Sequence, residues 1–447
     1  MTLLRPSLRR FWPGLLAPMV MLVLAGGISR PVRAAPKADL AVDLVPNDAA
    51  FYGSMLRNRE QWEIVAKSRA WAKLKALPIV QTGLMVYGLQ AMNPESVPGK
   101  IEAALRGPEV KKALDLARDM ASQEMFVYGG RGTIDFLGLC QQVIGAMRYG
   151  PAIAQLTGKG KEMSPDKIQQ KVIVSALCQN VSLIKAPDLV IGFRVKDLDL
   201  ARRELKQLED LASNALAAKP ELKARLKKAT VAGHEYLTLS LDGGMLPWDR
   251  GIADQLRELE SQPGDVDKLV EQLKKTTLVV AIGLRDDYLL VSIGPSTEAL
   301  ARLGHGPSLR TRPELAPLGK FADKPLVSIG YVSKPMIAHL KGGKRDIDQL
   351  LGMVDKFLPA LNLPEDANSE IRKDAAALVA DLKRFVPEPG AMFALGFLVP
   401  GGSETYSYDW GEHGELDASK PLSLLEHVGG SPFLAGQEYR SSDTTWW

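Results

Sequence analysis

Residues 276–293 are TTLVVAIGLRDDYLLVSI, and this stretch decides the fold class. Two apolar runs, 276–284 and 287–293, flank the polar pair Arg285 and Asp286. Strand-forming residues separated by a short polar turn are typical of a β-hairpin. Because a hairpin requires antiparallel pairing, the sequence predicts an antiparallel sheet here.

The elements on either side of this hairpin alternate irregularly. A second hairpin is predicted from 391–399 and 404–410, around Gly401 and Gly402. Apolar runs predict further strands at 49–56, 124–129, 188–195, 235–241 and 325–332. Helical periodicity predicts helices at 58–77, 108–121, 133–149, 166–184, 198–216, 296–303, 347–358 and 371–385. A doubly wound parallel fold would need regular strand–helix alternation. We therefore predict an α+β fold, with antiparallel, curved sheets built from hairpins and covered by amphipathic helices.

A glycine recurs in the middle of an apolar pattern along the predicted strands. It is found at Gly53, Gly129, Gly192, Gly283, Gly330 and Gly396. Glycine weakens a strand and often marks a bulge or a close approach of another part of the chain. The recurrence indicates strongly curved sheets, and an old internal duplication is one explanation for it. The alternative is coincidence, because the chain contains 40 glycines and no fixed period is visible.

We divide the chain into a signal peptide and three regions. They are the signal peptide (1–34), an N-terminal α+β region (35–185), a central region of strand, helix, strand, hairpin and helix (186–340), and a C-terminal α+β region (341–447). The chain ends in Trp446 and Trp447, which are poorly suited to a solvated tail. Either they pack on the core or an interface, or the reading frame continues beyond them.

The first 34 residues have the three parts of a secretory signal peptide. Arg9 and Arg10 belong to a basic start, and residues 14–27 are almost entirely apolar. Val32 and Ala34 then supply small residues at the cleavage site. We predict cleavage after Ala34 and export to the periplasm, the extracellular space or the cell envelope. An uncleaved anchor is the alternative, although the apolar run is shorter than the ~20 residues that a spanning helix needs.

The charge balance of the exported part differs from that of the whole chain. The full sequence has a net charge of +4, with 56 Lys and Arg against 52 Asp and Glu. Residues 1–34 contain five arginines and no acid, so their removal changes the net charge from +4 to −1. Nucleic-acid-binding proteins carry a basic footprint that such a chain lacks. We expect no nucleic-acid partner, and no membrane span once the signal is removed.

The chain has two cysteines, Cys140 and Cys178. Export would bring them into an oxidising compartment, where they could form a disulfide. The alternative is two buried thiols that act as small apolar residues. Their spacing excludes a Cys-x-x-Cys redox or zinc motif.

Common catalytic motifs are missing from the sequence. It has no His-Glu-x-x-His, no Gly-x-Ser-x-Gly, no Walker A loop and no Gly-x-Gly-x-x-Gly between a strand and a helix. Ser164 with Lys167, and Ser182 with Lys185, match the Ser-x-x-Lys pattern of penicillin-binding enzymes. That chemistry also needs Ser-Asp-Asn and Lys-Thr-Gly, which the sequence lacks. We therefore assign no catalytic residue and no cofactor.

One acidic stretch is a candidate metal site. Its ligands would be Asp409, Glu412, His413, Glu415 and Asp417. Oxygen ligands suit a hard cation, but the spacing matches no calcium loop. A solvated acidic loop after the second hairpin is the alternative.

Five short stretches carry a resemblance to a known family. They are Val45-Pro46-x-Asp48-Ala49-x-x-Tyr52, Gly233-x-x-Tyr236, Asp287-Tyr288-Leu289-Leu290-Val291-Ser292, Ser296-x-Glu298-Ala299-Leu300, and Ser308-Leu309 with Arg312-Pro313-Glu314-Leu315. In these stretches the chain resembles a bacterial family of exported proteins defined only as a domain of unknown function. The resemblance implies an exported α+β protein and supplies no catalytic residues.

Together these features favour an exported, non-catalytic protein with a binding or structural role in the bacterial cell envelope. The main alternative is a carrier of an apolar or lipidic ligand, held between a curved sheet and its helices. A third hypothesis is a hydrolase that uses scattered carboxylates. An apolar cavity would favour the carrier, and paired acids about 5–10 Å apart in one cleft would favour the hydrolase. The sequence indicates no oligomeric state.

Overall fold

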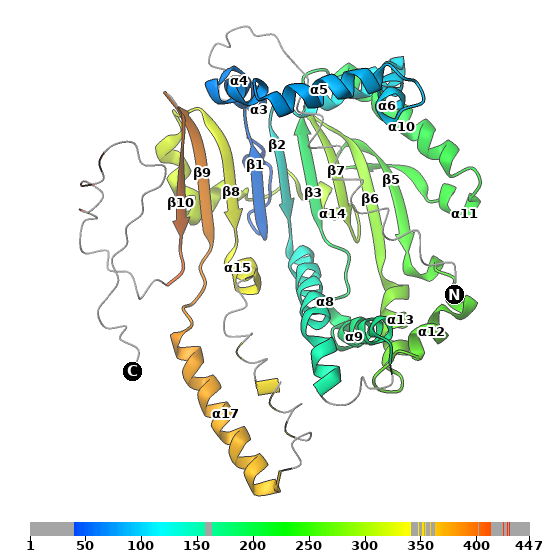
Figure 1. Ribbon diagram of the computed structural model, residues 1–447, viewed down its shortest axis with the longest axis vertical. Coiled ribbons are helices and arrows are strands. Elements are labelled where there is room, and N and C mark those ends of the chain that lie inside the picture. Colours follow the sequence, from blue (N-terminus) through cyan, green and yellow to red (C-terminus); the bar gives the residue numbers. More distant parts are fainter. Residues whose placement is uncertain are drawn as a thin grey trace.

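The structure is a computed structural model that describes residues 40–156, 163–340, 363–400 and 402–412, and the single positions 347, 351, 352, 354, 358, 423, 427 and 429. Its strands are β1 (Phe51–Met55), β2 (Met125–Gly129), β3 (Leu189–Arg194), β4 (Leu226–Val231), β5 (His234–Asp242), β6 (Thr277–Arg285), β7 (Tyr288–Gly294), β8 (Leu326–Val332), β9 (Met392–Val399) and β10 (Gly402–Asp409). Within the described residues these ten strands form one open antiparallel sheet, in the order β10-β9-β8-β1-β2-β3-β7-β6-β5-β4 (Figure 1). The predicted α+β class is confirmed.

Helices and short helical turns connect the strands. The α-helices are α3 (Asn58–Lys67), α4 (Arg69–Lys75), α5 (Pro78–Ala91), α6 (Val97–Leu105), α7 (Pro108–Met120), α8 (Arg131–Leu156), α9 (Pro165–Gln179), α10 (Leu198–Ala215), α11 (Pro220–Lys223), α12 (Ala253–Arg257), α13 (Asp265–Lys275), α14 (Glu298–Arg302), α15 (Lys334–Leu340) and α17 (Glu365–Phe385). The short turns are η2 (Ala41–Asp43), η3 (Val181–Leu183), η4 (Gly243–Met245), the π-helical η5 (Trp248–Ile252), η6 (Leu309–Thr311) and η7 (Pro313–Phe321).

The two predicted hairpins are present as β6–β7 and β9–β10. In the first, Arg285 pairs with Tyr288, so the turn residues are Asp286 and Asp287. The turn lies one residue later than predicted. Asp286 has a φ of 50°, a left-handed conformation that aspartate tolerates in turns.

A third hairpin, β4–β5, is only half predicted. Its turn residues, Ala232 and Gly233, both have positive φ, as a tight two-residue hairpin turn requires. The sequence predicted β5 but not β4, whose Lys227 and Lys228 interrupt the apolar pattern. Because β4 is the last strand of the sheet, exposed lysines here protect a free edge from further pairing.

The predicted helix over 58–77 is two helices. Ser68 has an extended conformation, with a ψ of 149°, and its hydroxyl accepts a hydrogen bond from the Trp71 N–H. This serine ends α3 and caps α4. The predicted helix over 347–358 lies mostly outside the described residues.

The three predicted regions share one sheet. β1 and β2 come from 35–185, β3 to β8 from 186–340, and β9 and β10 from 341–447. The central strand β1 pairs with β2 on one side and with the distant β8 on the other. The core is therefore continuous across all three regions.

Most of one face of the sheet is covered, although Tyr406 at its β10 edge is 41% exposed. Tyr331, Tyr52 and Tyr128 stand side by side in register across β8, β1 and β2, and all three are buried. The segments around η2, α14, η6 and η7 return over this face and pack Val42, Leu300, Leu303, Leu309, Leu315 and Leu318 against it. We call it the covered face.

Three strand glycines are explained by a neighbouring aromatic ring. Gly192 of β3 lies directly opposite Phe126 of β2, and a Cβ atom at Gly192 would collide with the Phe126 ring. Gly283 is placed in the same way against Tyr236 of β5, and Gly129 against Phe51 of β1. These contacts give a local packing reason for three of the six recurring glycines, while the proposed duplication stays a prediction.

Helices gather at both ends of the strands (Figure 1). The helices α3 to α6 lie across one end, and α8, α9, α12 and α13 lie at the opposite end. On the second face of the sheet, α7 and α10 pack Leu116 and Ala201 against Phe193 and Leu289. Within the described part of the chain, no helix combines the length and the apolar character needed to cross a bilayer.

Candidate functional site

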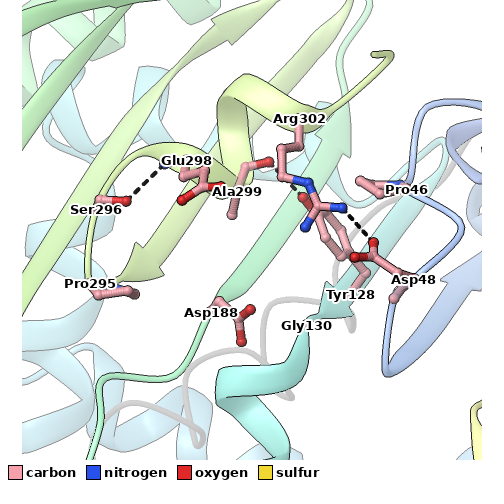
Figure 2. A pocket seen from close by; sticks show the side chains of 11 residues that line it. Pro46, Asp48, Tyr128, Gly130, Asp188, Pro295, Ser296, Glu298, Ala299 and Arg302 are labelled. Carbon is pink, nitrogen blue, oxygen red and sulfur yellow. Dashed lines mark hydrogen bonds and ion pairs between the residues drawn. The ribbon is translucent and has the colours of Figure 1, made fainter. Parts of the chain in front are cut away.

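Figure 2 shows a hollow lined by polar side chains at one edge of the sheet, which we call the polar hollow. Its volume is about 140 Å³, and it is lined by Pro46, Asp48, Ala49, Tyr128, Gly130, Asp188, Pro295, Ser296, Glu298, Ala299 and Arg302. These residues lie before β1, at the end of β2, before β3 and after β7. Antiparallel neighbours bring alternate strand starts and ends to one edge, so the sheet order places all four segments together.

An ion pair closes one side of the hollow. The Arg302 Nη2 atom lies 2.6 Å from the Asp48 Oδ1 atom (Figure 2). The hydrogen bond with Asp48 raises the pKa of Arg302, so the guanidinium stays charged. This pair joins the loop before β1 to α14, across more than 250 positions of sequence.

A tyrosine forms the floor of the hollow. The Tyr128 hydroxyl donates a hydrogen bond to the Ala299 carbonyl oxygen at 2.7 Å. Burial raises the pKa of Tyr128 far above that of a free phenol. The phenol therefore keeps its proton and acts as a structural donor, not as a base or nucleophile.

The Asp188 carboxylate is occupied by the start of α8. Its Oδ1 atom accepts hydrogen bonds from the Thr133 N–H at 2.7 Å and from the Thr133 hydroxyl at 3.1 Å. A carboxylate at a helix N-terminus is favoured by the exposed N–H groups and by the helix dipole. Glycine at position 130 lets the Asp188 carboxylate come close to the backbone, because a Cβ atom there would collide with that carboxylate.

The hollow therefore acts as a structural junction. Two of its three carboxylates, Asp48 and Asp188, already bind an arginine and a helix terminus. A volume of about 140 Å³ holds a few water molecules and lies below the ~300 Å³ at which drug-sized ligand pockets begin.

Three of the five stretches that carried the family resemblance meet at this junction. Pro46, Asp48 and Ala49 face Ser296, Glu298 and Ala299 across the hollow. The Leu309 N–H donates to the Val45 carbonyl at 2.7 Å, and the Arg312 Nη1 atom donates to the Asn47 carbonyl at 3.0 Å.

Sequence reasoning did not single out Tyr128, Gly130, Asp188 or Arg302 as partners of these stretches. The pair Gly129-Gly130, between a strand and a helix, was the available signal of a tight turn. Nothing in the spacing linked it to Asp188.

A second polar cluster lies at the opposite end of the same four strands. The Glu124 side chain is 3% exposed, and its Oε atoms accept from the Ala41 N–H at 3.0 Å and the Tyr288 hydroxyl at 2.6 Å. Arg194 lies 3.8 Å from the Glu124 carboxylate, and its guanidinium stacks over the Tyr288 ring at 4.8 Å. Burial raises the pKa of Glu124 despite these partners. The cluster fastens the start of the described chain to the sheet.

Only part of the predicted metal set is described. Asp409 accepts from the Gly411 N–H at 2.8 Å, and Glu412 accepts from the Glu388 N–H at 3.2 Å. His413, Glu415 and Asp417 lie outside the described residues. In the part of the chain that the structure describes, no group of three or more His, Cys, Asp or Glu could hold a metal ion. The five-residue set stays a prediction.

The two cysteines lie on neighbouring helices, Cys140 on α8 and Cys178 on α9, and both thiols are free in this structure. Cys178 packs against the cluster of Val174, Val266 and Val270, and burial raises its pKa. A raised pKa lowers the thiolate fraction and hence the reactivity. Their pairing stays a prediction.

The two Ser-x-x-Lys matches have structural roles. The Ser164 hydroxyl accepts a hydrogen bond from the Lys167 backbone N–H and caps α9. The Lys185 ammonium pairs with Asp135 of α8 at 2.8 Å.

Comparison with known proteins adds no relative: no protein-family model matches this sequence, and no curated protein or solved structure matches it significantly.

Proposed function

We propose that the chain is an exported, non-catalytic protein of the bacterial cell envelope that acts by binding. The observation that carries this proposal is helix α5, whose 14 residues include no charge. None of its residues is buried, and Ile79 and Leu84 are 79% and 62% exposed. Monomeric soluble proteins rarely leave a contiguous apolar patch of this kind in water, and such patches mark interaction sites.

One further feature supports binding over catalysis, and another supports export. The polar hollow engages Asp48, Asp188 and Tyr128 in structural bonds, and none of these groups is left in the state of an activated base or nucleophile. The N-terminal 34 residues have the pattern of a signal peptide.

Export is tested by expressing the full chain in a bacterium and measuring the mass of the processed protein. We expect cleavage after Ala34 and recovery from the periplasmic or envelope fraction. Ala34→Arg places a large charged residue at the cleavage site and should block processing, whereas Ser29→Ala should not. An unprocessed, cytoplasmic wild type would refute the export part of the proposal.

Binding is tested on the same exported protein by envelope fractionation. The variant with Leu84→Asp and Leu89→Asp places charges on the exposed apolar helix and should release the protein from the envelope. Leu211→Asp, at an equally exposed leucine of α10, is the matched control and should behave as the wild type. A wild type that stays wholly in the soluble fraction, as a monomer, would refute the binding role.

A carrier of an apolar ligand is the second candidate. An open hollow of about 640 Å³ lies between α11, the end of β5 and η4, and its apolar lining includes Leu222, Leu241, Met245 and Leu246. This volume falls within the ~300–1,000 Å³ of small-molecule sites. A carrier should show extra mass in the native spectrum that is lost on denaturation and absent from Leu246→Asp. A bare native mass in the wild type would count against the carrier.

A further inference from the structure

Helices α4, α5 and α6 together form what we call the apolar arm, at one end of the sheet (Figure 1). The principal contacts of α5 are with α4 and α6. The exposed apolar surface continues beyond α5 to Met92, Val97 and Ile101, with Met92 81% exposed. The arm is therefore apolar well beyond a single helix.

The exposure of α5 extends around its circumference. Leu84, Met85, Val86 and Tyr87 are consecutive and all exposed. Successive residues of an α-helix are about 100° apart, so these four side chains point in nearly every direction around the axis. A second protein surface would cover one side of such a helix, whereas lipid acyl chains can surround it. Helices that are apolar on all sides are found in protein cores or in membranes.

The charges on the α4 side of α5 all have one sign, whereas the α6 side carries Glu95 and Glu102 beside Lys100. Residues 64–94 contain four cations and no acid. Lys67 pairs with Glu63 at 3.5 Å. Arg69, Lys73 and Lys75 are exposed and form no ion pair within the described part of the chain. Three free cations beside an apolar helix complement a surface of anionic lipid headgroups.

The length of α5 indicates how it would meet a bilayer. Fourteen residues give a helix of about 21 Å, short of the ~30 Å hydrocarbon core, so α5 would lie in the bilayer surface and not span it.

A tryptophan lies beside α5. Trp71 of α4 is half-buried against Trp62, at a ring distance of 6.5 Å. Tryptophan is enriched where headgroups meet acyl chains.

We propose that the apolar arm docks this protein on a membrane surface that contains anionic phospholipid, with α5 lying among the acyl chains and the cations of α4 at the headgroups. The inference rests on the proposed envelope function and names its partner as a lipid surface.

The test is flotation of the exported, processed protein with two kinds of vesicle. One kind is phosphatidylcholine alone, and the other is an equal mixture of phosphatidylcholine and phosphatidylglycerol. We expect binding to both, with tighter binding to the anionic vesicles and a loss of that difference at high salt. Binding to neither would overturn the inference.

Variants separate the charge from the apolar contribution. Replacing Lys73 and Lys75 with Gln should weaken binding to anionic vesicles about 25-fold, since each basic residue near such a surface is worth about fivefold. Binding to phosphatidylcholine should not change. Leu84→Asp with Leu89→Asp should abolish binding to both vesicles. The matched controls on α10, Lys206→Gln and Leu211→Asp, should bind as the wild type does. Unchanged binding by the Leu84 and Leu89 variant would overturn the inference.

A second copy of the chain is the competing occupant. Sedimentation without lipid should give a monomer for both wild type and variants. A lipid-free dimer that the Leu84 and Leu89 variant dissociates would assign the arm to self-association and overturn the inference. If vesicles fail to bind but this variant still leaves the envelope fraction, the lipid partner is wrong while the proposed binding function stands. Circular dichroism checks that each variant is folded. Substitutions in α5 should leave the fold intact, because none of its residues is buried.

Discussion

The covered face of the sheet and helix α5 are both strongly apolar, yet they lie in opposite environments. Tyr331, Phe393 and Leu395 are almost fully buried, whereas no residue of α5 is buried. The difference arises from whether later segments of the chain fold back over each region. The segments around η2 and η7 fold back over the sheet, whereas the principal neighbours of α5 are the adjacent helices α4 and α6. Apolar composition therefore favours burial. The path of the chain decides which apolar surface the protein covers itself and which one stays exposed for a partner.

The largest expected contrast is between two leucines. Leu290 is 1% exposed on the covered face and Leu84 is 62% exposed on α5. Leu290→Ala should lower the free energy of unfolding by about 2–5 kcal/mol, because it removes buried methyl groups and leaves a cavity. Leu84→Ala should change it by no more than about 0.5 kcal/mol. Urea denaturation of both variants measures the difference. Equal losses of unfolding free energy would contradict the comparison, since Leu84 would then be packed against other parts of the protein in solution.

A second contrast uses two strand glycines. Gly192→Ala forces a methyl group into the Phe126 ring and should cost about 1–3 kcal/mol. Gly330→Ala is the control, because its Cβ would meet nothing within 4 Å. The control should be neutral or slightly stabilising, as it restricts the unfolded chain. Thermal unfolding of the pair would sharpen the comparison, and a Gly192→Ala protein as stable as the control would contradict the packing described at β2 and β3.

A third prediction concerns the buried carboxyl of Glu124. Burial raises its pKa, so the folded protein keeps this proton to a higher pH than the unfolded chain does. Below the ordinary glutamate pKa of ~4.3 both states are protonated and the stabilising contribution is fully present. It is lost as the pH rises through the raised folded value.

Glu124→Gln cannot ionise and supplies the measurement. The stability of this variant relative to the wild type should improve as the pH rises from about 4 toward neutrality. Urea midpoints at several pH values would show the trend. Glu221→Gln, at an exposed glutamate of α11, is the control for the loss of a surface carboxylate. A relative stability of Glu124→Gln that falls with pH would contradict the raised pKa.

The smallest expected effect is at the exposed ion pair of the polar hollow. Asp48 and Arg302 have side chains that are 60% and 47% exposed. A double-mutant cycle with Asp48→Asn and Arg302→Gln should give a coupling of about 0.2–1 kcal/mol that falls with added salt. A coupling well above that range would mean that the hollow is less solvated than its geometry implies and would reopen it as a binding site.

The sequence located most strands correctly, because the covered face imposes an alternation that is visible locally. It missed β4, where solvent-facing lysines hide the pattern, and it missed α5 for the opposite reason. The run PIVQTGLMVYGLQA is apolar on every side, so it has no amphipathic period to detect. The residues that the sequence analysis could not interpret as a helix are those that carry the functional proposal.

The polar hollow could be anticipated only in part. The stretches around Pro46 and Ser296 stood out in the sequence, but their partners Asp188 and Arg302 did not. Their proximity depends on β1, β2, β3 and β7 being neighbours, and that order comes from long-range pairing. No local spacing encodes it.

The sequence by itself determined the α+β class, the two main hairpins and most helix positions, because period, turn residues and caps act over a few neighbours. It also predicts the export signal and the near-neutral charge of the mature chain. Only the tertiary structure decided that all three regions share one sheet, that the glycine at 192 faces an aromatic ring, and that α5 remains uncovered. These outcomes depend on which distant segments fold back on which surface. Burial is a property of that arrangement and not of any single stretch.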